Sequence, residues 1–265
     1  MRINILTLFP EMFTAVTESS ILGKAGEKGI LDVRLINIRD FTKDKHRKTD
    51  EYPFGGGVGM VMTAQPIFDA LRSLNLNVPD AGSGAKGGAV EGGAGGKIIY
   101  MSPRGKILDR QKIEELAEME EITILCGHYE GVDQRVLDEW DMEEISIGDY
   151  ILTGGELAAM VLIDSVSRFI PEVLGSEESA MEESIYSGLL EYDQYTKPRE
   201  YEGLTVPEVL FGGNHKRIHL WQYECSLRLT KERRPDLFEA YLTKEKKLSK
   251  DEKKILEAIA AKPQI

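Results

Sequence analysis

The sequence predicts an α/β protein built on a parallel sheet with helices on both faces. Short apolar segments alternate with helix-like stretches through the first 170 residues, which is typical of a sheet whose helices connect successive parallel strands. The composition, with 42% hydrophobic and 29% charged residues, is that of an ordinary globular chain that can bury a sizeable core.

Five segments are expected to form strands. The second alternates apolar and polar residues, whereas the last three are short and continuously apolar, as in strands buried on both faces. The five are Ile3–Phe9, Leu31–Ile38, Lys97–Met101, Ile122–Cys126 and Ile145–Ile147. Helices are expected from Pro10, which suits a first helical position, over Ala64–Leu74, and at about Asp109–Glu120, Asp133–Trp140 and Glu156–Ile170.

The remainder of the chain predicts a second, smaller domain. Residues 171–199 are acidic and poorly periodic, and we interpret them as a linker between a domain over residues 1–170 and another over residues 200–265. Four stretches of the second domain have helical character: Val206–Leu210, Lys216–Leu229, Pro235–Leu242 and Asp251–Ala261. We therefore expect this C-terminal domain to be α-helical.

Composition excludes several classes of protein. No apolar run approaches the roughly 18 residues of a membrane span, no signal-peptide cleavage site follows the N-terminal strand, and two cysteines are too few for a disulfide framework. These features predict a cytoplasmic protein without a membrane partner. The net charge of −12 argues against indiscriminate coating of nucleic acid.

Charge is nevertheless unevenly distributed along the chain. Arg39–Lys48 carries five basic and two acidic residues and His215–Arg234 six basic and two acidic, whereas Glu172–Asp193 carries seven acidic residues and no basic one. Taken alone, such runs are more often solvated faces than binding sites. The glycine-rich segment 81–96 contains a G-x-G-x-x-G spacing, but it lacks the flanking strand and helix of a dinucleotide site.

Three loops follow the last three predicted strands, at the edge where open α/β sheets bind ligands. They are Ser102–Gly105, Gly127–Gly131 and Gly148–Glu156. In the third loop, Thr153 and Glu156 have the spacing of a capping box. Gly154 and Gly155 would let a ligand approach the backbone N–H groups of the helix start, although a plain, well-capped helix is the alternative.

Cysteine and histidine residues carry weaker signals. Cys126 and His128 could be a nucleophile and its base, but a cysteine that ends a buried strand is more often a core residue. His215 and His219 lack the further ligands of a zinc site, so no metal site is predicted.

A glycine-rich loop follows the first basic run. Gly55–Met60 is flanked by Tyr52 and Phe54. Basic, aromatic and glycine residues together suit contacts with phosphates and bases, and a surface loop without a partner is an equal alternative.

Motifs along nearly the whole chain resemble those of bacterial tRNA (guanine-N1)-methyltransferases. The most specific are SIGDYILTGGE (Ser146–Glu156) and SRFIPEVLG (Ser167–Gly175). Also matching, in order, are LFPEMF, RDFTKDKHRKTD, GGGVGM, YMSPRG, CGHYEGVDQR, YTKPREYEG and LFGGNH. The resemblance implies the SPOUT fold, with a trefoil knot in the first domain, a tRNA-binding helical C-terminal domain, and a homodimer whose active sites are shared between subunits.

The same resemblance implies a reaction and its binding residues. A methyl group would pass from S-adenosylmethionine to N1 of guanosine 37 of tRNA, 3′ to the anticodon. Residues implied to hold the donor are Tyr100, Met101, Ser102, Pro103, Gly127, Glu130, Ser146, Ile147, Gly148, Tyr150, Leu152, Gly154 and Gly155. Those implied to bind tRNA are His46, Asp50, Gly59 and His215. Mg²⁺ is a possible further requirement.

Two residues are implied to act on the guanine. Arg168 matches the family's arginine, which stabilises negative charge on guanine O6. The family's general base is usually an aspartate before Ser-Phe, whereas this chain has Glu182-Glu183-Ser184-Ile185, so Glu183 is the matching residue and Glu182 the alternative. Two other functions remain open: methylation of a different nucleotide, and RNA binding without catalysis.

Overall fold

The computed structural model describes residues 1–74, 76, 96–174 and 187–261. Two compact units, Met1–Glu177 and Glu178–Ile265, divide the chain within the predicted 171–199 linker. The glycine-rich segment 81–96, apart from its last residue, lies outside the described residues, as do both candidate bases, Glu182 and Glu183.

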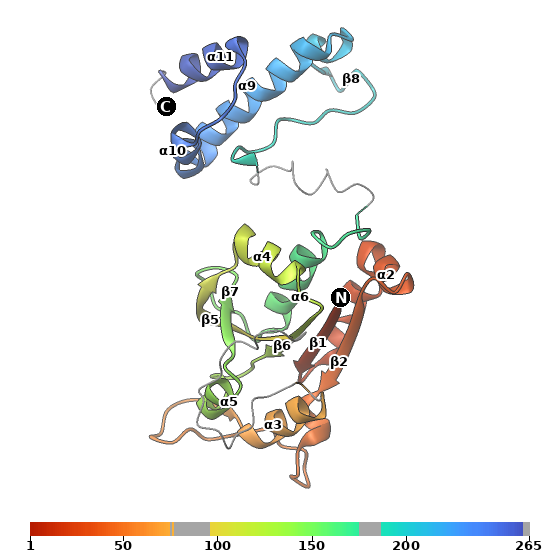
Figure 1. Ribbon diagram of the computed structural model, residues 1–265, viewed down its shortest axis with the longest axis vertical. Coiled ribbons are helices and arrows are strands. Elements are labelled where there is room, and N and C mark those ends of the chain that lie inside the picture. The colour runs from red at the N-terminus through yellow and green to blue at the C-terminus, as the bar shows by residue number, and fades with distance from the viewer. Residues whose placement is uncertain (75, 77–95, 175–186, 262–265) are drawn as a thin grey trace. The chain divides into compact units, whose positions relative to one another are not determined.

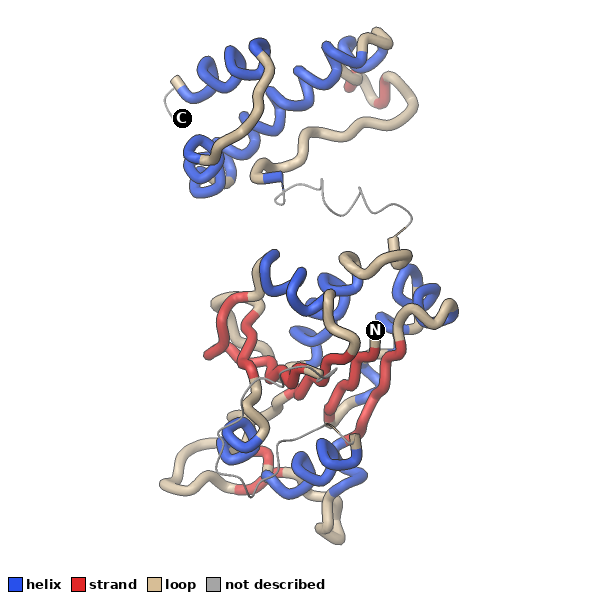
Figure 2. Tube along the Cα trace, viewed as in Figure 1, coloured by secondary structure: helices blue, strands red, loops and turns tan. Residues whose placement is uncertain are grey.

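A five-stranded parallel sheet forms the centre of the first unit (Figures 1 and 2). Its strands are β1 (Arg2–Thr7), β2 (Asp32–Asn37), β5 (Lys97–Ile107), β6 (Glu121–Cys126) and β7 (Glu143–Ser146). Their order is β2-β1-β6-β5-β7, and every neighbouring pair is parallel. The predicted class and all five predicted strands are confirmed.

Strand β5 extends further than predicted. It continues to Ile107, and its register with β7 shifts so that both Met101 and Lys106 pair with Ile145. The expected loop Ser102–Gly105 is therefore a bulge inside a strand, where proline and glycine are tolerated. The prediction that the strand ends at Met101 is wrong, because the bulge lets the strand continue past Pro103 and Gly105 to Ile107.

Helices cover both faces of the sheet, as predicted (Figure 1). One face packs against α2 (Ser20–Glu27), α4 (Arg110–Ala117) and α6 (Glu156–Ser167), and the other against α3 (Ala64–Ser73) and α5 (Gln134–Glu139). Residues Ile3 and Ile5 of β1 belong to the first core cluster and Leu6 to the second. Because side chains alternate along a strand, one strand supplies both cores.

Short elements complete the first unit. The helix expected from Pro10 is divided into a 3-10 turn, η1 (Pro10–Met12), and α1 (Thr14–Thr17), and α2 begins at Ser20, whose φ is 54°. A second 3-10 turn, η2 (Ile38–Phe41), precedes a small hairpin of β3 (Asp50–Glu51) and β4 (Val61–Met62).

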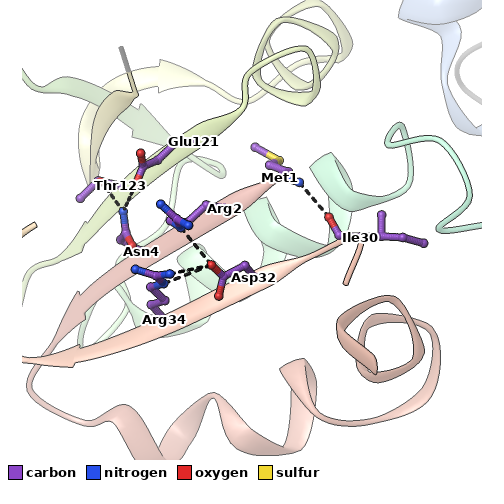
Figure 3. A network of polar contacts seen from close by, with 8 residues as sticks. All are labelled: Met1, Arg2, Asn4, Ile30, Asp32, Arg34, Glu121 and Thr123. Carbon is purple, nitrogen blue, oxygen red and sulfur yellow. Dashed lines mark hydrogen bonds and ion pairs between the residues drawn. The ribbon is translucent and has the colours of Figure 1, made fainter. Parts of the chain in front are cut away.

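A polar network joins β2, β1 and β6 (Figure 3). The buried Asn4 donates to Glu121 Oε1 at 2.7 Å and to Thr123 Oγ1 at 3.2 Å. Arg2 pairs with Asp32 at 2.9 Å, and this hydrogen bond is the largest cause that holds the pKa of Asp32 below its usual value. Since a buried amide is costly without partners, the network favours one register of the three strands.

The second unit is mainly helical. It contains the hairpin β8 (Glu200–Tyr201) and β9 (Leu204–Thr205), the 3-10 turn η3 (Glu208–Phe211), and helices α9 (His215–Arg233), α10 (Pro235–Thr243) and α11 (Lys250–Ala260). Its core is formed by Leu189, Leu227, Phe238, Tyr241 and Ile259. In the described parts of the chain, every helix is too short or too polar to cross a membrane.

Candidate functional site

A cavity of about 280 Å³ opens at the carboxyl ends of β6 and β7 and at the bulge of β5. Three segments line it: the end of β5 with its bulge, the loop after β6, and the loop between β7 and α6. These strands are neighbours in the sheet, so the bulge of β5 lies beside the loops after β6 and β7. The three predicted segments therefore come together, the first as a strand bulge and not as a loop.

The cavity brings together every residue that the resemblance assigned to the methyl donor. The thirteen are Tyr100, Met101, Ser102, Pro103, Gly127, Glu130, Ser146, Ile147, Gly148, Tyr150, Leu152, Gly154 and Gly155. Seven further lining residues were not predicted: His128, Tyr129, Gly131, Ile145, Ile151, Thr153 and Ala158. Most of them lie between predicted residues in the same loops, so their place in these loops could have identified them as lining residues.

The loop after β6 and the start of α6 are in direct backbone contact. The Gly155 N–H donates to Gly127 O at 2.8 Å, and His128 forms an isolated bridge with Gly154. A Cβ on Gly155 would lie 2.9 Å from Cys126 Cα, and one on Gly127 would lie 2.7 Å from Tyr100 Oη. Glycine is therefore required here for close packing.

The predicted capping box at the start of α6 is wrong. Gly155, not Thr153, is the N-cap, and no side chain caps the helix. The Glu156 carboxylate instead points inward and accepts a hydrogen bond from Thr7 Oγ1 at 2.8 Å. Only 2% of Glu156 is exposed. The first N–H groups of α6 therefore have no capping side chain, so they can serve a ligand in the adjoining cavity.

A tight turn shapes the segment between β7 and α6. Ser146 Oγ accepts from Gly148 N at 3.2 Å and donates to Gly148 O at 3.1 Å, and Gly148 adopts a φ of 147°. Tyr150 Oη donates to Ile147 O at 3.2 Å. These bonds fold residues 146–150 back on themselves, so that backbone as well as side chains lines the cavity.

Tyr100, which lines the cavity, and Cys126, which precedes the lining residue Gly127, have shifted pKa values. Burial, with a smaller contribution from Glu144, raises the pKa of Tyr100, so its hydroxyl stays protonated and able to donate. Burial, reinforced by Glu156, raises the pKa of the Cys126 thiol well above its usual value. Cys126 is fully buried and is a core residue, as the sequence favoured, and not a nucleophile.

Arg168 lies away from this cavity. It is the C-cap of α6, whereas the cavity adjoins the N-cap, Gly155. At about 1.5 Å per residue, the two ends of the helix are roughly 20 Å apart. The sequence-predicted catalytic arginine and the cavity of the same chain are therefore not brought together.

Three of the predicted tRNA-contact residues surround the β3–β4 hairpin. His46 is exposed in the basic segment before β3, Asp50 is half-buried in β3, and Gly59 lies in the hairpin loop with a φ of 91°. Gly59 packs on Glu130, since a Cβ there would lie 2.5 Å from Glu130 Cγ. The Glu130 N–H donates to Met60 O at 3.0 Å, which attaches this hairpin to the cavity rim.

The hairpin loop presents apolar side chains to solvent. Tyr52, Phe54 and Val58 are 75%, 102% and 94% exposed. Large apolar groups exposed together are typical of a contact surface. In the adjacent basic segment, Lys43 pairs with Asp69 at 3.0 Å and Arg47 pairs with Asp40.

The fourth predicted tRNA-contact residue belongs to the second unit. His215 is exposed at the start of α9, where Asn214 Oδ1 caps the helix by accepting from Arg217 N at 3.1 Å. Lys216 pairs with Asp251 at 2.6 Å. The parts of the chain that the structure describes contain no group of three or more His, Cys, Asp or Glu residues arranged to hold a metal ion.

Comparisons with known proteins agree on one family. The sequence profile of tRNA (Guanine-1)-methyltransferase TrmD matches residues 1–240. A tRNA (guanine-N(1)-)-methyltransferase of Clostridium perfringens (strain 13 / Type A) is 51% identical over 97% of this chain and 100% of its own length. Enzymes of the same description are 50% identical in Clostridioides difficile, over 90% of this chain and 97% of theirs, and 53% identical in Alkaliphilus metalliredigens, over 89% and 91%.

The close approach of Gly155 to β6 yields a prediction about stability. Gly155→Ala should lower the free energy of unfolding by about 1–3 kcal/mol, because the added Cβ meets the backbone of Cys126 and Gly127. Chemical denaturation measures this change. Gly26→Ala, in α2 with only Leu31 O at 4.0 Å, is the control and should be neutral or stabilising; equal losses in the two variants would contradict the packing argument.

Proposed function

We propose the methyl donor and the target of this chain, which belongs to the tRNA (guanine-1)-methyltransferase family and is an enzyme of that type. The donor is S-adenosylmethionine, and the target is N1 of guanosine 37, directly 3′ of the anticodon. The observation that carries this proposal is that one cavity is lined by all thirteen residues matched to the family's donor site.

The cavity suits S-adenosylmethionine chemically. Gly127, Gly154 and Gly155 line the cavity without side chains, so adenine and the donor's polar tail can approach the backbone of both loops. Ser146 and the protonated Tyr100 add hydroxyl groups. Bound there, S-adenosylmethionine supplies an electrophilic methyl group on a positively charged sulfur.

The chain's own residues would prepare guanine for this methyl group. Guanine N1 carries a proton and becomes nucleophilic when a carboxylate, Glu183 in our assignment, accepts that proton. Negative charge then develops on O6, and the Arg168 guanidinium stabilises it. The N1–C bond forms as the C–S bond breaks, and the proton remains on the glutamate. Glutamate preserves the chemistry of the family's aspartate with one more methylene.

A homodimer with shared active sites accounts for the position of Arg168. The roughly 20 Å between the ends of α6 separates Arg168 from the cavity of its own chain. On α6, Leu157 and Val161 are 48% and 46% exposed and are four residues apart, so they form an apolar strip. A second copy packed on this strip could bring its Arg168 to the first copy's cavity.

Two surfaces are proposed to contact tRNA. One combines the basic segment Arg39–Asp50, including His46 and Asp50, with the hairpin loop that carries Gly59. The other is the segment His215–Arg234 of the second unit, which contains α9. The positive charges suit phosphates, and the exposed Tyr52 and Phe54 suit stacking on unpaired bases.

The trefoil knot is part of the same proposal. It is supported by the contact between the loop after β6 and the start of α6. The Gly155 N–H donates to Gly127 O, and His128 bridges to Gly154. Such close contact between the two segments is expected where a knotted chain crosses itself. A magnesium requirement has only the resemblance in its favour.

The target base gives the direct test of this function. Incubation of the protein with S-adenosylmethionine and a tRNA transcript that has guanine 3′ of the anticodon should yield 1-methylguanosine, identified by mass spectrometry of the digested nucleosides. Replacing that guanine by adenine should abolish methyl transfer, and replacing a guanine elsewhere in the loop should not. Unchanged methylation after the first replacement would assign the enzyme to a different nucleotide.

Arg168→Ala should reduce turnover by about 100-fold or more while leaving affinity for S-adenosylmethionine unchanged. Gly154→Val should lose that affinity, because the added side chain meets His128 and Glu156. If two copies share each site, mixing the two inactive variants should restore up to about a quarter of parental activity. No recovery in mixed dimers, verified by mass, would contradict shared sites.

Variants of two adjacent glutamates test which of them is the general base. Glu183→Gln should lower the single-turnover rate by about 100-fold or more, whereas Glu182→Gln, its matched control, should remain close to the parent. Glu183→Asp, which restores the family's residue type, should retain most of the rate. Comparable losses in both glutamine variants would show that the base is misassigned.

A further inference from the structure

The imidazole of His128 and the buried carboxylate of Glu156 lie close together beside the cavity. His128 Nδ1 lies 3.9 Å from Glu156 Oε2, and it has no hydrogen-bond partner among the residues that the structure describes. A buried nitrogen without a partner is costly. The pair belongs to neither of the residue sets assigned above, so its role requires a separate explanation.

The other oxygen of Glu156 is already engaged. The Phe9 N–H donates to Thr7 Oγ1 at 2.9 Å, and Thr7 Oγ1 lies 2.8 Å from Glu156 Oε1. Because a backbone N–H can only donate, the threonine hydroxyl proton is directed to Oε1. Oε2 therefore remains for a second donor. Glu156 is 2% exposed, and a carboxylate so deeply buried needs such a partner.

The imidazole of His128 is held in an orientation that suits this partner. Its ring packs against Phe9 and Tyr129, with centroid distances of 5.1 and 5.0 Å, and its backbone bridges to Gly154. Nδ1 is buried on the Glu156 side, whereas about 24% of the side chain is exposed and lines the cavity. The ring therefore connects the buried carboxylate with the binding site.

Gly154 is the residue that allows the pair to form. A Cβ at this position would lie 2.4 Å from Glu156 Oε2 and 2.5 Å from His128 Nδ1, so any other residue would separate them. A hydrogen bond requires the two atoms, 3.9 Å apart, to approach by about 1 Å, so the proposed pair includes a small rotation of the two side chains.

We propose that Glu156 and His128 form a carboxylate–imidazole pair that positions the Gly127–Gly131 loop for S-adenosylmethionine. Nδ1–H donates to Oε2, and this fixes the tautomer in which Nε2 is an acceptor toward the cavity. Such an acceptor suits a hydroxyl or ammonium group, and the proposed methyl donor carries both. His128 is thus a positioning residue, and its role rests on the proposed function.

The tautomer of His128 tests the pair in the unliganded protein. The ¹⁵N spectrum of histidine-labelled protein should show one of the four histidines as the neutral Nδ1–H tautomer, and this signal should be missing in His128→Phe. Glu156→Gln should remove its preference for that tautomer. An Nε2–H tautomer for His128 in the parent would overturn the proposal, even if both variants failed to fold.

Binding measurements test whether the pair acts on the donor site. By calorimetry, His128→Phe and Glu156→Gln should each weaken S-adenosylmethionine binding about tenfold, and the double variant should also lose about tenfold, since the two act as one unit. Glu118→Gln, a substitution of an exposed glutamate at the end of α4, is the control and should bind as the parent does.

Unchanged affinities, or a roughly hundredfold loss in the double variant, would overturn the coupling. A parent that binds no S-adenosylmethionine would overturn the proposed function, while the tautomer still tests the pair.

Discussion

The close contact between the end of β6 and the start of α6 is the constraint on which the cavity depends. The Gly155 N–H to Gly127 O hydrogen bond of 2.8 Å and the lack of space for any Cβ at Gly155 hold two loops from non-adjacent strands together. Between them in the sheet lies β5, whose bulge closes the remaining side. Backbone groups that would otherwise be covered by side chains are left for a ligand.

The same contact organises the buried polar groups beneath the cavity. Glu156 is the first residue of α6, yet its carboxylate turns inward to Thr7 and toward His128. The Glu156 side chain thus links Thr7 at the end of β1 to His128 in the cavity wall. Arg168, at the opposite end of the same helix, has no corresponding position near the cavity of its own chain. In the proposed function, one helix thus contributes its N-terminus to donor binding and its C-terminus to the guanine of a second site.

Sequence reasoning succeeded where the signal was local. Apolar runs located all five sheet strands, and the order of the predicted strands placed the three segments that follow them side by side, although the first is a strand bulge. It failed where the partner was distant: the T-x-x-E spacing predicted a capping box, but the Glu156 side chain binds Thr7, 149 residues away in sequence. The bulge in β5 depends on pairing with β7, which no local pattern shows. The residues of the donor site came from resemblance to a family, because single glycines in loops do not identify a ligand.

A crystal structure of the protein with S-adenosylhomocysteine would test the central claim most directly, namely that this glycine-walled cavity is the donor site. We expect the ligand to lie between Tyr100, Gly127 and Gly155, with hydrogen bonds to backbone groups of the loops after β6 and β7, and with Arg168 of a second copy nearby. A ligand bound elsewhere, or a cavity filled only by its own side chains at saturating ligand, would contradict the account.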